Sequence, residues 1–75
     1  MNRLDNKKEN FRRIAESRTN KIIDMISLLG NLSNSSYYEY SDTQIEAIFD
    51  AIQLELDKQR SRFREIKNSK KRFQL

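Results

Sequence analysis

The chain of 75 residues contains no proline, cysteine, histidine or tryptophan, and Gly30 is its only glycine. Without cysteine there is no disulfide framework and no thiolate metal site. Without histidine, a zinc or copper centre and a histidine general base are excluded. No apolar run approaches the roughly 20 residues of a membrane span, and the charged start of the sequence lacks the apolar stretch of a secretory signal. We therefore predict a cytoplasmic protein with no metal, no cofactor and no membrane association.

Catalysis has no support in the residues that are present. The sequence has no glycine-rich loop for phosphates and no nucleophile placed beside a base. The short chain also has little surface to bury and no covalent cross-link, and self-association is a common remedy for both. These features predict a non-enzymatic protein that has no small-molecule substrate and that forms a homodimer.

Apolar residues in the first half recur at steps of four and three, which is the period of an amphipathic helix. The pattern predicts a helix over about residues 7–29. Asn6 and Glu9 have the spacing of a capping box at its start, and Gly30 stands where a left-handed residue ends many helices. The seam of this helix comprises Phe11, Ala15, Arg18, Ile22, Met25 and Leu29.

The second half repeats the pattern and predicts a helix over about residues 42–68, with Ser41 and Gln44 as its capping box. A polar loop at 30–41 and a basic tail at 69–75 complete a single domain, 1–75. The fold class is all-α: a two-helix antiparallel hairpin that dimerises into a four-helix bundle. The second seam comprises Ile45, Phe49, Ile52, Leu56, Gln59, Phe63 and Ile66.

Two features break or extend these seams. Arg18 and Gln59 interrupt them, either as side chains whose stems pack or as a polar layer that fixes the register. Further apolar residues lie off the seams, either as ordinary surface hydrophobics or as the contact between two hairpins. We favour the contact and predict an oligomer interface at Ile23, Leu28, Ala47, Ala51 and Leu54.

Charge divides the chain into three blocks. Residues 1–21 carry a net charge of +4, residues 22–57 carry −7 with no basic side chain, and residues 58–75 carry +7. A hairpin would bring both basic blocks to its open end, the basic pole, and the acidic block to its loop end. Three uses remain open: solubility, attraction between hairpins, and binding of a polyanion such as nucleic acid.

The C-terminal basic density favours the polyanion. Lysine and arginine neutralise phosphates, whereas the acidic start and long preceding loop of the second helix do not fit a helix-turn-helix. An anionic membrane surface is the less favoured ligand, because the apolar residues here continue the seam. We predict contact with nucleic acid or a nucleoprotein complex through Arg60, Arg62, Arg64, Lys67, Lys70, Lys71 and Arg72.

The runner-up function is protein binding. Tyr37, Tyr38 and Glu39 lie in an acidic loop, and tyrosine is enriched at protein interfaces. The loop and the surface of the second helix would then form the docking face of an adaptor or inhibitor. The alternative is that the tyrosines only cover the end of the bundle.

Several segments carry a resemblance: RTNKI at 18–22, LLGNLSN at 28–34, YEYS at 38–41, and IFDAI at 48–52 with EL at 55–56. Over about residues 11–63 they resemble short uncharacterised helical-hairpin proteins of Gram-positive plasmids and integrative mobile elements. The resemblance implies an accessory or regulatory role in a mobile element, with inhibition of a host defence complex among such roles. It carries over no site residue, and the basic tail lies outside it.

Overall fold

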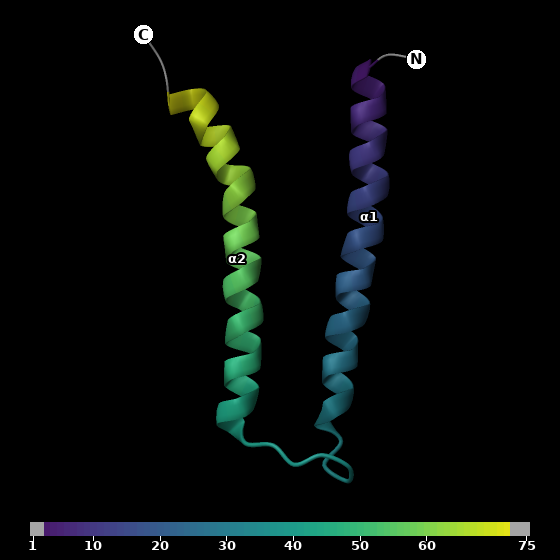
Figure 1. Cartoon of the computed structure of the whole chain (residues 1–75), viewed down its shortest axis with the longest axis vertical. Helices are drawn as coiled ribbons and strands as arrows, with labels where there is room; N and C mark the ends of the chain where they lie inside the picture. The colour runs from purple at the N-terminus through teal and green to yellow at the C-terminus, as the bar shows by residue number, and fades with distance from the viewer. Residues whose placement is uncertain (1–2, 73–75) are drawn as a thin grey trace. The chain divides into compact units, whose positions relative to one another are not determined.

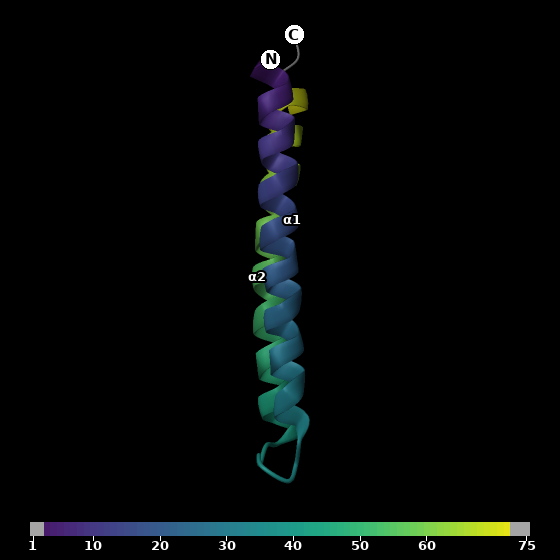
Figure 2. The same cartoon turned by 90° about the vertical axis from the view of Figure 1, so that its right-hand side faces the viewer.

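A computed structural model of the chain describes the backbone of residues 3–72 and the side chains of residues 6–66. The described residues form two long helices, α1 (Arg3–Gly30) and α2 (Asp42–Arg72), with a short 3-10 helix, η1 (Asn31–Ser33), directly after α1, and they form no strand. Each long helix is continuous along its length in Figure 1, and α1 can also be followed without a break in Figure 2. The prediction of an all-α chain with two helices is confirmed.

The chain divides into two units, Met1–Glu39 and Tyr40–Leu75. The first unit holds α1, η1 and most of the connecting loop, and the second holds α2. At a rise of 1.5 Å per residue, α1 with 28 residues and α2 with 31 residues are roughly 42 and 46 Å long. Within the described residues neither helix has a stretch that is both long and apolar enough to cross a membrane.

The predicted start of α1 is wrong. The helix already includes Arg3, so Asn6 lies within it and does not act as a cap. A capping residue needs a non-helical backbone, which the helical conformation of Asn6 excludes. Arg3 and Leu4 are good helix formers, and Asp5 suits the positive end of the helix dipole, so the residues before Asn6 favour extension of the helix.

The predicted role of Gly30 is also wrong. Its φ of −60° and ψ of −29° are right-handed helical values, and the chain continues into η1. The connection turns instead at Asn34, whose carbonyl oxygen accepts hydrogen bonds from the N–H groups of Tyr37 and Tyr38, both at 3.1 Å. Asn34 also accepts a hydrogen bond at Oδ1 from the N–H of Ser36 at 3.0 Å. Asparagine favours such turns because its side chain replaces a backbone partner.

Gly30→Ala is expected to stabilise the protein by roughly 0.5–1 kcal/mol, because glycine in a helical conformation costs about that much relative to alanine. A Cβ at this position meets no atom within 4 Å. Urea denaturation followed by circular dichroism measures the change. A loss of stability would show that Gly30 needs a left-handed backbone after all.

The predicted start of α2 is confirmed. The N–H of Ser41 donates to Oε1 of Gln44 at 2.8 Å, and the N–H of Gln44 donates to Oγ of Ser41 at 3.2 Å. This reciprocal capping box satisfies two N–H groups that have no partner within the helix. At its other end α2 continues past the predicted residue 68 to Arg72, so residues 69–72 of the predicted basic tail are helical.

Neither unit has a hydrophobic core among its described side chains. None of these side chains is buried. The half-buried ones are Ala15, Leu29, Ile45 and Ile52, and all four belong to the predicted seams. Large seam residues stay open, with Phe11 65%, Met25 67% and Phe63 68% exposed. Most of the apolar surface of each helix therefore remains available to a partner.

Candidate nucleic-acid interface

The predicted nucleic-acid-binding residues all lie on the C-terminal part of α2. Arg60, Arg62 and Arg64 are exposed. Lys67, Lys70, Lys71 and Arg72 occupy helical positions of α2, while their side chains lie outside the described ones. The helical backbone fixes the angular position of all seven around the axis, so they can be assigned to faces.

Four of the seven share one face. Arg60, Arg64, Lys67 and Lys71 are spaced by four, three and four residues, and such neighbours lie one above another on a helix. The first and last of these positions are eleven residues apart, or roughly 16 Å along the helix. One strand of a duplex places about five phosphates in that axial length, at roughly 3.4 Å each. We call these four positions the cationic row.

Arg60 and Arg64 are the two members of the cationic row whose side chains are described. Among residues 6–66 neither guanidinium takes part in an ion pair or a side-chain hydrogen bond. An arginine without an internal partner keeps all its donors for an external acceptor such as a phosphate. The cationic row is therefore the part of the predicted site that is best arranged for a polyanion.

Arg62 is placed differently. At about 100° per residue it lies on the opposite side of α2 from Arg60. Its Nη1 donates to Oε1 of Gln59 at 3.2 Å, and the Nε2 of Gln59 in turn donates to a carboxylate oxygen of Glu55. Gln59, which interrupts the seam, is thus hydrogen-bonded along its own helix. Lys70 and Arg72 also occupy positions away from the cationic row.

An open hollow of about 320 Å³ adjoins Arg62. It is lined by Gln59, Arg62, Phe63 and Ile66, which follow the spacing i, i+3, i+4 and i+7. Four residues at this spacing form the hole that receives a side chain of a facing helix in coiled-coil packing. The hollow therefore has the form of a coiled-coil hole on the seam of α2, and it is separate from the cationic row.

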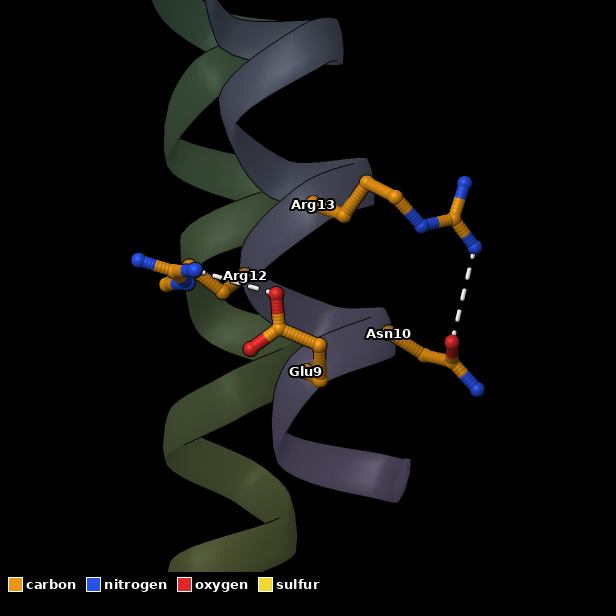
Figure 3. Close-up of polar contacts among 4 residues, drawn as sticks. All are labelled: Glu9, Asn10, Arg12 and Arg13. Carbon is orange, nitrogen blue, oxygen red and sulfur yellow. Dashed lines mark hydrogen bonds and ion pairs between the residues drawn. The ribbon is translucent and has the colours of Figure 1, made fainter. Parts of the chain in front are cut away.

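The basic side chains of α1 are arranged less favourably for a phosphate. Arg12 pairs through Nη2 with Oε1 of Glu9 at 3.0 Å, and Nη2 of Arg13 donates to Oδ1 of Asn10 at 3.4 Å (Figure 3). Both contacts link residues three apart on the exposed surface of one helix. The ion pair places a negative charge beside Arg12, which weakens its attraction for an external anion.

The predicted protein-binding loop belongs to the unit that contains α1. Its backbone is shaped by the turn at Asn34, and it presents Tyr37 and Tyr38 with 80% and 50% of their surface exposed. Glu39 is exposed next to them. Tyrosine is enriched at protein interfaces, so the exposure of these two side chains is consistent with the predicted role of the loop.

The residues of the predicted oligomer interface are all exposed. Ile23 and Leu28 are 57% and 62% exposed on α1, and Leu54 is 72% exposed on α2 beside Ala47 and Ala51. On α2 these three lie at about 160° from the seam, by 100° per residue. One contact cannot bury both faces of α2, so the stripe and the seam need different neighbours.

The division of the basic residues by face was not predicted from the sequence. Arg60, Arg64 and Lys67 lie within the predicted helix over residues 42–68 at steps of four and three, and Lys71 joins them because α2 extends to Arg72. Among the described residues no group of three or more Asp or Glu side chains is placed to hold a metal ion.

No protein-family model, curated protein or solved structure matches this chain.

Proposed function

We propose that the protein is a non-enzymatic nucleic-acid-binding factor that contacts phosphates through the cationic row of α2. The observation that carries the proposal is the alignment of Arg60 and Arg64 with positions 67 and 71 on one helix face. Phosphate contacts by such a row fix the position of a protein on a strand but do not read its sequence. The resemblance to mobile-element proteins suggests an accessory or regulatory role there, and a cytoplasmic location is part of the same proposal.

The proposed scaffold is an antiparallel hairpin. The two seams have matching steps of four and three, so pairing Leu29 with Ile45 also pairs Ile22 with Ile52 and Phe11 with Phe63. Phe11 then fills the hollow formed around Phe63. Two such hairpins associate into a four-helix bundle, in which neighbouring copies cover the remaining apolar surface.

A salt titration tests the function most directly. We expect the protein to bind mixed-sequence DNA and RNA at low salt, with log K falling linearly against log salt concentration at a slope of about −0.9 per contacted phosphate on duplex DNA. Fluorescence anisotropy of labelled oligonucleotides measures both quantities. An absence of binding at about 50 mM salt, where such contacts are strongest, contradicts the proposal.

The second candidate is a protein-binding adaptor or inhibitor, for example of a host defence complex. The observation that favours it is the 80% exposure of Tyr37 on a hydrogen-bonded turn. Docking would use Tyr37, Tyr38 and Glu39 together with the surface of α2. Changing both tyrosines to serine abolishes this function and leaves a salt-dependent affinity for nucleic acid unchanged, so the two candidates are separable.

A further inference from the structure

One face of α2 changes the sign of its charge halfway along the helix. Six residues at alternating steps of four and three lie in one line, and all six are exposed. The acidic half lies nearer the start of α2. The basic half follows it and is the cationic row. We call this line the bipolar row: Glu46, Asp50, Gln53, Asp57, Arg60 and Arg64, with Lys67 and Lys71 continuing it by position.

The bipolar row is complementary to itself in one direction only. Two copies of α2 side by side and parallel would put each charge beside the same charge, which is repulsive. Two antiparallel copies, related by a two-fold axis between residues 58 and 59, put Asp57 level with Arg60 of the second copy. The same axis puts Gln53 level with Arg64, and positions 50 and 46 level with 67 and 71. Every acidic position then faces a basic one.

We propose that α2 pairs with α2 of a second copy of this chain, antiparallel along the bipolar row, with Asp57 of each copy beside Arg60 of the other. The local geometry suits this contact. Gln53 Nε2 donates to Oδ1 of Asp57 at 2.9 Å, which orients the carboxylate within the row. Among residues 6–66 no ion pair engages Asp57, Arg60 or Arg64, so these charges remain to be matched.

The charges select one register. A shift of the two-fold axis by half a heptad toward the C-terminus puts Arg60 beside Arg64 of the second copy and is repulsive at the centre. A shift of the same size the other way puts Asp57 beside Gln53 and loses one of the three kinds of acid–base pair. The register with its axis between residues 58 and 59 retains all three kinds of pair. Such pairs fix orientation and register, while apolar burial along the seams supplies the affinity.

The contact is compatible with the hairpin. The bipolar row lies about 90° around α2 from its seam, by 100° per residue. A helix of a four-helix bundle contacts one neighbour on each of two such flanks. The pairing goes beyond nucleic-acid binding and does not require it. Both use Arg60 and Arg64, however, so a bound polyanion and the second copy compete for the same guanidinium groups.

Complementary charge reversals test the pairing. Asp57→Arg places like charges level with each other in the homodimer, and Arg60→Asp does the same with the opposite sign. Each single variant is expected to dimerise roughly ten-fold more weakly than the original chain, because two attractions become repulsions. An equimolar mixture restores both attractions, so a heterodimer of about the original affinity is expected. Sedimentation equilibrium without nucleic acid measures all three affinities.

Two controls make the same charge changes off the row. Glu65→Arg and Lys58→Asp alter the same helix on its other side and are expected to leave dimerisation within about two-fold, as surface charges without a partner do. Circular dichroism checks that every variant keeps its helices. Dimer affinities that follow the row but not the controls support the pairing.

Several results overturn the pairing. The pairing is wrong if the unmodified chain sediments as a monomer. It is also wrong if the dimer in the mixture is no more stable than the dimer of either variant alone. Rescue of Arg60→Asp by Asp50→Arg instead of Asp57→Arg establishes the shifted register. Dissociation by Ala51→Glu with Leu54→Glu, together with no response to the row variants, assigns the interface to the apolar stripe on the far side of α2. Because no nucleic acid is present, none of these results bears on the proposed binding of nucleic acid, although a monomer would also contradict the proposed four-helix bundle.

Discussion

Leu56→Asp is expected to abolish the helical circular-dichroism signal of the chain at micromolar concentration. Leu56 lies on the seam of α2, between Ile52 and Gln59. No described side chain is buried within its own unit, so under the proposed hairpin the packing of the seams supplies most of the stability and buries Leu56, which is 51% exposed on α2 alone. Loss of a buried leucine costs about 2–5 kcal/mol, and burying an unpaired carboxylate costs more. The sum is comparable with the whole stability of a small domain.

Leu54→Asp is the matched control, since it makes the same change two residues away on the same helix. Leu54 is 72% exposed and lies on the other side of α2 from the seam. Its helical signal should persist, with a shift in sedimentation only if the predicted stripe of Ala47, Ala51 and Leu54 is an interface. Tolerance of Leu56→Asp combined with collapse of Leu54→Asp would mean that the seam has been assigned to the wrong face.

The second large effect is expected for nucleic acid. Changing Lys67, Lys70, Lys71 and Arg72 to glutamine should reduce the salt slope by up to about 3.6 on duplex DNA, at 0.9 for each lost phosphate contact. Affinity near 100 mM salt should fall roughly a hundred-fold or more. Helix content should change little, because exposed charges each contribute only tenths of a kcal/mol. Anisotropy titrations at several salt concentrations measure the slope.

The cationic row predicts which of these four residues contribute most to the loss of salt slope. Lys67 and Lys71 belong to the row, whereas Lys70 and Arg72 do not, and each pair removes two charges from the same end of α2. The first double variant should therefore lose more of the slope than the second. Equal losses would show that net charge alone governs binding. Changing Arg12, Arg13, Arg18 and Lys21 to glutamine controls for net charge elsewhere in the chain and should have the smaller effect.

The start of α2 was predictable because its signal is local. Ser41 and Gln44 need only each other and the backbone between them, so their spacing in the sequence already specifies two hydrogen bonds. The periodic seams were predictable for a similar reason, since the helical repeat places residues four and three apart on one face whatever lies elsewhere. These two signals account for the correct prediction of the two long helices, whereas η1 lies in the segment predicted as a loop.

Gly30 shows why other boundaries were not predictable. Glycine accepts both signs of φ at little cost, so its presence permits a left-handed end without requiring one. The conformation of Gly30 depends on the residues that follow it. Asn31–Ser33 continue as a 3-10 helix, and the turn is formed at Asn34. The prediction for Asn6 was wrong for a related reason. An N-terminal capping residue acts only where a helix begins, and α1 already begins at Arg3.

The candidate site was predictable in content but not in arrangement. Composition located the cations, and the predicted helix over residues 42–68 already contained Arg60, Arg64 and Lys67, but the full length of α2 was needed before Lys71 could be aligned with them. The hydrogen bonds of Arg62 to Gln59 and of Gln59 to Glu55 depend on side-chain conformation, which no spacing specifies. Sequence reasoning therefore found the segment, and the helix geometry divided it into a row and a remainder.

The absence of buried side chains among residues 6–66 has a consequence for gene dosage. If the contacts that stabilise the helices are made between copies, folding and assembly become one bimolecular step, and the folded fraction rises with expression level. Chains synthesised below the threshold stay unfolded and open to proteolysis, whereas chains above it protect one another. Doubling the number of gene copies then more than doubles the amount of folded protein. The folded fraction therefore depends on how much of the chain the cell makes.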